Sequence, residues 1–248
     1  MGADLRVISI GALAAHPLWQ ERGPVRTGHA TCTLVRTPGP SAATIVVDPG
    51  LPPGAIAARL GERAGIGPEA VTHVFLTSYH PDTHRGIELF ERAVWLISAE
   101  EREGVGVPLV HRLRQAVEDG HEDAARLLEH QIALLRRCEV APDALAPGVD
   151  LFPLPGVTPG TCGLLIEDRP EGTALICGDA VATVEHLQRG MVLPHCADVS
   201  LARQSFAEAV QIADLLVLGR DNAVMNPGDD VLPEHARGLP VREPGPEG

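Results

Sequence analysis

Short apolar runs that predict buried strands alternate along this chain with stretches of helical spacing. Strands are expected at 5–10, 29–36, 43–48, 73–76, 93–97, 161–167, 173–177 and 214–218, and helices at 54–64, 87–92 and 201–212. Each strand must bury at least one face and each helix one stripe, so a mixed succession of this kind packs in layers around a shared core. The sequence therefore predicts one α/β (α+β) layered domain over residues 1–225.

Two regions differ from the rest of this pattern. Residues 108–138 place apolar side chains at helical spacing among charges, with Gly120 as the expected break between two helices. Residues 226–248 are rich in Pro, Gly and acids and are expected to form a loose tail.

Charge and cysteine usage narrow the class of protein. The chain has 33 acidic residues against 20 basic ones, all arginine, for a formal net charge of −13. Because nucleic acids and anionic membranes are bound mainly by basic side chains, neither partner is expected. The absence of lysine excludes Schiff-base chemistry. No signal peptide, membrane span, disulfide framework or thiolate zinc cage is predicted, and a cytoplasmic protein is the expectation.

The densest polar cluster of the chain, residues 77–86, directly follows the apolar run 73–76. It contains His80, Asp82 and His84, and neutral imidazole and carboxylate both suit Zn²⁺, Fe or Mn²⁺. A solvated loop with an Asx turn at Asp82 would explain the same residues. Three other loops rich in Gly and polar residues end expected strands, at 155–160, 177–180 and 219–222. Together they predict a pocket along one edge of the sheets.

These loops resemble the motifs of the metallo-β-lactamase-fold hydrolases. LTSYHPDTHRG is similar to the family's LTHxHPDHxGG, PGVTPG to PGHTPG, CGDA to GDA, and LGRDN to PGHDN, and the early VVDPG is similar to its strand ending in D-x-G. The order of the motifs also agrees, and residues 108–138 fall where the family inserts helices. The resemblance covers about residues 5–225 and implies a four-layered αβ/βα sandwich.

The resemblance also implies where metal ligands would stand. Four of the seven ligand positions carry other residues here, namely Ser78, Thr83, Val157 and Arg220. The positions that keep a ligand are His80, Asp82 and Asp179. A catalytic zinc ion needs about three protein ligands and an open position. A complete dinuclear centre is therefore not expected, and the cofactor is either none or one divalent metal, with zinc favoured.

Arg220 offers a physical reason for the loss of the metal. Two partly buried carboxylates without their cation would repel each other, and a forked guanidinium could bind both Asp82 and Asp179 and replace the metal's charge. Alternatively, Asp82 caps backbone N–H groups of its own loop and Asp179 closes a strand-end turn.

Two main functional hypotheses follow. The first is a divergent member of the fold without the usual zinc-dependent hydrolase activity, which keeps a pocket for a small-molecule ligand. The second is a hydrolase of an ester, thioester, lactone or phosphoester, with one metal held by His80, Asp82 and Asp179, with or without the displaced His84, and with Asp82 as the candidate catalytic residue.

Two further alternatives remain. One is an interaction module with an apolar patch on the helices of 108–138, and the other a Cys–His nucleophile at His195 and Cys196. Cys162 and Cys177 are expected to be small buried residues.

Overall fold

Two six-stranded sheets form the centre of the computed structural model, which describes residues 2–167 and 169–226. The first sheet contains, in order, β1 (Asp4–Ser9), β2 (Cys32–Arg36), β3 (Thr44–Val47), β4 (His73–Leu76), β5 (Val94–Ile97) and β6 (Glu139–Val140). The second contains, in order, β12 (Ala223–Met225), β11 (Leu215–Leu218), β10 (Ala174–Gly178), β9 (Cys162–Ile166), β8 (Val149–Pro153) and β7 (Ala144–Ala146).

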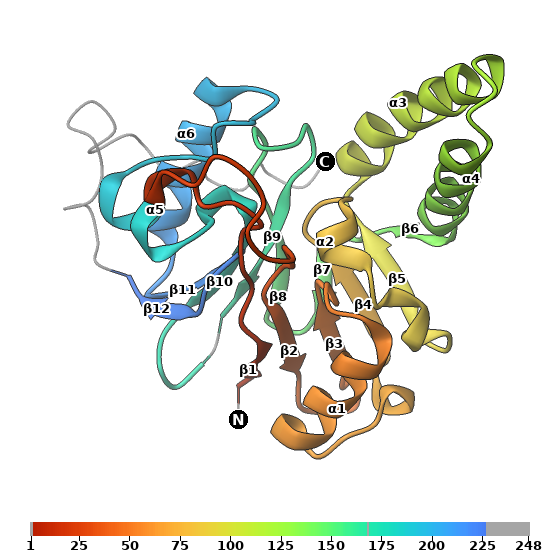
Figure 1. Ribbon diagram of the computed structural model, residues 1–248. Coiled ribbons are helices and arrows are strands. Elements are labelled where there is room, and N and C mark those ends of the chain that lie inside the picture. The colour runs from red at the N-terminus through yellow and green to blue at the C-terminus, as the bar shows by residue number, and fades with distance from the viewer. Residues whose placement is uncertain (1, 168, 227–248) are drawn as a thin grey trace, which may run out of the picture.

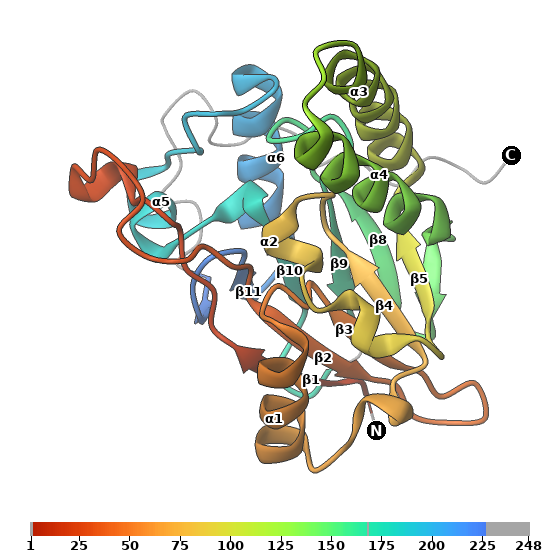
Figure 2. The ribbon, with the colours of Figure 1, turned by 45° about the vertical axis from the view of Figure 1, so that its right-hand side comes forward.

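Helices cover the outer face of each sheet, as Figures 1 and 2 show. Those on the first sheet are α1 (Pro53–Ala64), α2 (Pro81–His84), α3 (Ala99–Glu118) and α4 (Glu122–Arg137), whereas α5 (Val184–Arg189) and α6 (Val199–Ile212) lie on the second. Short 3-10 helices are η1 (Pro17–Trp19), η2 (Pro68–Ala70), η3 (Ile87–Phe90) and η4 (Asp179–Val181). None of the helices in the described ranges combines the length and apolar character that a membrane crossing needs.

Three separate apolar clusters hold these four layers together. Because successive strand residues point to opposite faces, Val46 and Val74 pack against the helices of the first sheet, while Val47 and Phe75 pack against the second sheet. Side chains of the second sheet likewise point either into the core between the two sheets or into the core under α5 and α6. The expected four-layered αβ/βα sandwich is confirmed.

Strand direction brings the functional loops to one edge of the sandwich. Strands β3, β4 and β5 are parallel, as are β10 and β11, so the segments that follow β10 and β11 emerge at a common edge of the second sheet. The backbone N–H of Cys162, at the start of β9, donates to the carbonyl of Thr77, just after β4, over 2.9 Å. This bond joins the loop edges of the two sheets.

The helical insertion begins earlier than the sequence indicates. Helix α3 starts at Ala99 rather than near residue 108, and the Ser98 hydroxyl caps it by accepting the N–H of Glu101 over 3.2 Å. Pro108 lies inside this helix, where its weak propensity is overridden by packing of Leu109 in the core. Likewise, the helix expected at 87–92 is only the 3-10 turn η3.

The second helix of the insertion follows the expected break closely. Gly120 separates α3 from α4, with a φ of +71° that suits glycine. Apart from Asn226, the expected tail at 226–248 lies outside the described residues.

Candidate functional site

A buried guanidinium joins two carboxylates at the loop edge. Arg220 Nε and Nη2 donate to Asp179 Oδ1 and Oδ2, each over 2.7 Å, and Nη1 donates to Asp82 Oδ2 over 2.8 Å. The Arg220 side chain is only 5% exposed, against 18% for Asp82 and 11% for Asp179. These three side chains are called the ion-pair cluster below. The forked contacts expected of Arg220 from the sequence are present.

The backbone fixes each member of the cluster. Asp179 directly follows β10, and Arg220 follows β11 by two residues. The Arg220 N–H donates to the Ala182 carbonyl over 2.7 Å, which ties the two loops together. Gly219 approaches the Gly178 backbone so closely that a Cβ would clash with its carbonyl. The side chain of Arg220 therefore leaves the backbone at a fixed point beside Asp179.

Asp82 is held by the turn of helix α2. The ring of His80 accepts the Asp82 N–H through Nδ1 over 3.2 Å, and the Thr83 hydroxyl accepts the His80 N–H, which completes a capping box. A second arginine, Arg85, donates to Asp82 Oδ1 over 3.1 Å. Asp82 thus pairs with two guanidinium groups, and in the described residues neither its carboxylate nor that of Asp179 caps a backbone N–H. The capping alternative does not describe their contacts.

The charges in the cluster stabilise one another. Burial alone would raise the pKa of Asp179, but the Arg220 charge and its hydrogen bonds outweigh burial and hold that pKa below its ordinary value. Burial would likewise lower the pKa of Arg220, and the carboxylates of Asp179 and Asp82 raise it instead. Asp179 and Arg220 therefore form an ionised pair at neutral pH.

Two buried acids that the sequence analysis does not single out support the same loops. Asp48 accepts the N–H and the hydroxyl of Thr77 over 2.9 and 2.6 Å. Burial raises its pKa to about 7, although the bonds from Thr77 act in the opposite direction. Its motif, VVDPG, is the only sequence signal for this position.

The second buried acid, Glu101, joins three segments and is fully buried. Its Oε1 accepts the Tyr79 N–H over 2.7 Å, and its Oε2 accepts the Thr158 hydroxyl over 2.6 Å and the Gly160 N–H over 3.1 Å. Its partners are 22 to 59 residues away in sequence, so no local pattern marks it.

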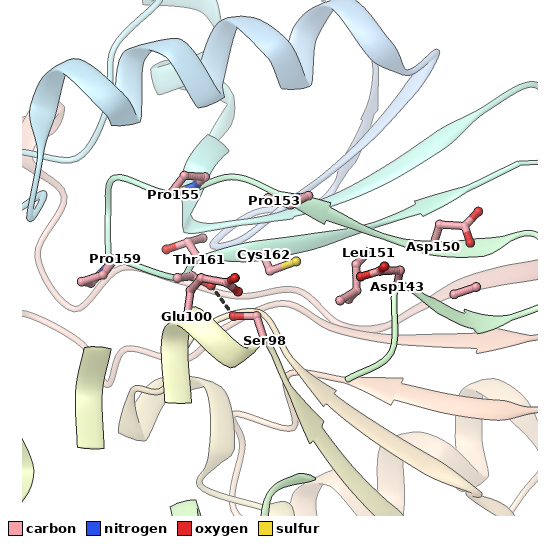
Figure 3. Close-up of a pocket in the computed structure, with 12 residues that line it drawn as sticks. Ser98, Glu100, Asp143, Asp150, Leu151, Pro153, Pro155, Pro159, Thr161 and Cys162 are labelled. Carbon is pink, nitrogen blue, oxygen red and sulfur yellow. Dashed lines mark hydrogen bonds between the residues drawn. The ribbon is translucent and has the colours of Figure 1, made fainter. Parts of the chain in front are cut away.

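A cavity of about 720 Å³ lies next to the loop at 155–161. Figure 3 shows Ser98, Glu100, Thr161 and Cys162 close together at one end of it, with Asp143 and Asp150 toward the other. The Ser98 hydroxyl donates to the Gly160 carbonyl over 2.7 Å. This volume is in the range of small-molecule pockets.

Comparison with known proteins assigns the family. The sequence model of the metallo-beta-lactamase superfamily matches residues 25–218, which is most of the chain. This chain belongs to the metallo-beta-lactamase superfamily. No curated protein sequence matches it significantly.

Several solved structures share this fold at low sequence identity. A candidate metallo-beta-lactamase from Thermotoga maritima is 18% identical with a TM-score of 0.65, and covers 91% of this chain and 100% of its own. A candidate metal-dependent hydrolase from Staphylococcus aureus is 16% identical with a TM-score of 0.62, over 93% and 91%. AidC, a dizinc quorum-quenching lactonase, is 14% identical with a TM-score of 0.59, over 92% and 90%.

The remaining superfamily motif positions do not gather as a ligand set. Ser78 and Thr83 are buried, and the Thr83 hydroxyl donates to the Ser78 and His80 carbonyls within its own loop. The ring of His84 stacks on Tyr79 with centroids 4.5 Å apart, and burial lowers its pKa to about 4. Val157 is half-buried in its loop. His84 therefore packs with the apolar core instead of joining the ion-pair cluster.

The donor set does not fit a superfamily metal centre. In residues 2–167 and 169–226, no group of three or more His, Cys, Asp and Glu side chains is placed to hold a metal ion. The carboxylate oxygens that would face a metal accept N–H groups of Arg220 instead, and a cation fixed between them repels a second cation. In the described residues, the oxygens of these two carboxylates are paired with guanidinium groups.

The cysteines provide no nucleophile in this arrangement. Cys162 and Cys177 are buried, as expected, and burial raises the pKa of both thiols. Cys196 donates to the Leu193 carbonyl over 2.9 Å, while its neighbour His195 is exposed. Burial, and then the charge of Asp179, raise the pKa of Cys196 as well. A reactive thiolate is disfavoured at each of these positions.

Proposed function

We propose that this chain is a metallo-beta-lactamase-fold protein without zinc-dependent hydrolase activity, in which the ion-pair cluster replaces the dinuclear metal centre. The single observation that carries the proposal is the forked contact of buried Arg220 with both retained carboxylates. The fold then serves to bind a small molecule at the loop edge rather than to activate water.

The energetics favour this assignment over simple loss of ligands. Two carboxylates near each other and largely shielded from water would drive one another toward protonation. A guanidinium has five N–H donors in a planar fork and is charged at every physiological pH, so Arg220 can bond both carboxylates at once; together with Arg85 on Asp82, two positive charges face two negative ones without a metal. Its charge remains fixed to the chain, whereas a metal ion must be acquired and retained.

The competing assignment is a mononuclear metal-dependent hydrolase. AidC and a Bacillus thuringiensis AiiA mutant crystallised with N-decanoyl-L-homoserine are among its structural neighbours. For this chain, such an activity would require Arg220 to leave the carboxylates so that His80, Asp82 and Asp179 can bind one metal. The His80 side chain is 56% exposed and its Nδ1 accepts the Asp82 N–H, so it is committed to the loop.

Metal analysis and a hydrolysis panel distinguish these assignments. The protein is purified without chelator, and zinc, iron and manganese are measured per chain before and after refolding with excess Zn²⁺. We expect well under one metal per chain and no hydrolysis of N-acyl homoserine lactones, thioesters or phosphoesters above background. Near-stoichiometric metal that disappears in Asp82→Ala and Asp179→Ala but persists in Asp150→Ala would overturn the proposal.

The partners and the compartment follow from the same reasoning. We propose a small-molecule ligand and neither nucleic acid nor an anionic membrane, because the acidic chain repels both polyanions. A cytoplasmic location agrees with five cysteines that are all free thiols.

A further inference from the structure

The cavity in Figure 3 combines apolar walls with acidic ends. Its volume of about 720 Å³ is large enough for a small molecule of several carbon atoms. The apolar side chains of its lining are Ala144, Leu151, Pro153, Pro155 and Pro159, and the acidic ones are Glu100, Asp143 and Asp150. Among the described residues, this lining includes neither arginine nor histidine, and the chain has no lysine. The cavity therefore has negative charges without a cation of its own.

The end of the cavity at Glu100 is held firmly by the start of α3. Gly160 lies so close to this helix that a Cβ on it would clash with the backbone nitrogen of Glu101. The Gly160 N–H donates to Glu101 Oε2 over 3.1 Å, and the Ser98 hydroxyl donates to the Gly160 carbonyl over 2.7 Å. Glu100, in the first turn of α3, therefore has a fixed position beside the loop at 155–161.

The other end of the cavity carries two acids from neighbouring strands. Asp143 directly precedes β7, and its carbonyl accepts the Leu151 N–H of β8 over 2.7 Å. Asp150 lies in β8, where it pairs with Ala144 of β7. Figure 3 shows Asp143 and Asp150 on the side of the cavity away from Glu100. Negative charge is thus present at two separated places, with apolar walls between them.

Cys162 connects the two ends electrostatically. In Figure 3 it lies between Glu100 and Asp143. Burial is the largest cause of the raised pKa of the Cys162 thiol, and the charges of Glu100 and Asp143 both raise it further. Both carboxylates therefore act on the same part of the cavity, where their negative potentials add.

These carboxylates are unpaired, yet they are too dispersed for a single metal ion. Over residues 2–167 and 169–226, the carboxylates of Glu100, Asp143 and Asp150 form no ion pair and no hydrogen bond. In the same part of the chain, no three His, Cys, Asp or Glu side chains converge as a metal ion requires. A ligand with two cationic groups joined by an apolar spacer matches this distribution of charge.

We propose that this cavity binds an aliphatic diamine, with one ammonium group paired to Glu100 and the other to Asp143 and Asp150. The methylene groups of the ligand pack against Leu151 and the three prolines, and each ammonium group forms charge-assisted hydrogen bonds. The inference rests on the part of the proposed function that assigns small-molecule binding to this fold. It uses no contact of the ion-pair cluster.

Three five-carbon probes test the charges that the ligand needs. 1,5-Diaminopentane carries two cations, pentylamine carries one, and 1,5-pentanediol carries none. Binding to the ¹⁵N-labelled full chain is followed by chemical-shift titration at pH 7 and low salt. We expect saturable binding of the diamine, binding of pentylamine that is about two- to fivefold weaker, and no saturable binding of the diol. Equal affinities of diamine and monoamine, or no saturable binding of the diamine, would overturn the proposal.

Conservative variants locate the binding site. Glu100→Gln and Asp143→Asn should each weaken diamine binding about two- to fivefold, the range for ion pairs at exposed carboxylates. Glu129→Gln changes an exposed acid on α4 outside the cavity and should leave binding unchanged. If all three variants weaken binding equally, the diamine responds only to the net charge of the chain, and the assigned site is wrong.

Calcium provides a competition experiment. Ca²⁺ at the same concentration should not displace the diamine beyond the effect of matched ionic strength, since the acids do not converge on one ion. Displacement by stoichiometric Ca²⁺ would identify a metal site and refute the choice of ligand. Because none of these measurements involves Arg220, their failure would leave the metal analysis of the ion-pair cluster unaffected.

Discussion

Replacing Arg220 by methionine should destabilise the protein by about 3–5 kcal/mol at pH 7, because it leaves the buried carboxylate of Asp179 without its cation and removes one of the two guanidinium partners of Asp82. The methionine keeps much of the side-chain volume, so the loss is mainly that of charge and of three hydrogen bonds. Arg85 still pairs with Asp82, which places most of the penalty on Asp179. Urea unfolding followed by circular dichroism measures the change.

The pH dependence of this loss has a definite sign. In the folded native protein the pKa of Asp179 lies below its ordinary value. The stabilisation that the ionised Asp179 provides is therefore fully present at pH values above the ordinary pKa, and it is lost as the pH falls through the lowered pKa. Without Arg220, burial is left as the dominant influence and raises the pKa of Asp179. The difference between Arg220→Met and the native protein should therefore be largest at neutral pH and shrink as the pH falls toward 4.

A second substitution separates charge balance from packing. Adding Asp179→Asn to Arg220→Met should recover part of the lost stability, because it removes the unbalanced charge. The control Arg36→Met breaks a pair with Asp4 in which the side chains are 35% and 46% exposed, and should cost less than about 1 kcal/mol. A loss for Arg220→Met no greater than that of the control, or no recovery in the double variant, would refute the reasoning.

Three other substitutions test the supports of the site. Burial raises the pKa of Asp48 to about 7, so the free energy of unfolding of the native protein should fall as the pH rises from about 4 to 7. The variant Asp48→Asn should show a flatter pH dependence, measured by urea unfolding at several pH values. Glu101→Gln should cost about 2–3 kcal/mol in the same assay, because an amide NH₂ would face donors that now meet a carboxylate oxygen. Gly50→Ala should lower the thermal midpoint, since its Cβ would clash with the Asp82 carbonyl, and an unchanged midpoint would contradict that contact.

The predictability of the fold varied with the length and periodicity of each segment. The sequence predicts strand β4 at 73–76, where three successive apolar residues follow His73 and precede a polar loop, and the structure has it at His73–Leu76. Strand β6 has only two residues, too few for any periodicity, and was not predicted. The start of α3 was missed because Gly104, Gly106 and Pro108 disfavour a helix locally, and its packing against the first sheet overrides that preference.

Some contacts of the candidate site could likewise be predicted from the sequence, and others could not. The contacts of Arg220 followed from its motif position, because a cation beside two acids has few other physical roles. The placement of Glu101 could not be predicted, since its partners Tyr79 and Gly160 are brought to it only by the complete fold. The stacking of His84 on Tyr79 was also hidden, because an aromatic contact leaves no spacing signal in the sequence.

The ion-pair cluster also gives a reason why Asp82 and Asp179 match the superfamily motifs while the positions of Ser78 and Val157 do not. A guanidinium needs acceptors, and Asp82 and Asp179 supply them. Histidines at the positions of Ser78 or Val157 would add neutral rings with no metal to bind. Protonation of these rings would be opposed by the positive charge of Arg220. Removing Arg220 alone leaves Asp179 without its cation, while Arg85 still pairs with Asp82. Under the proposed function, a metal ion and Arg220 compete for the same carboxylate oxygens of Asp82 and Asp179, so a metal could bind there only if Arg220 moved away from them.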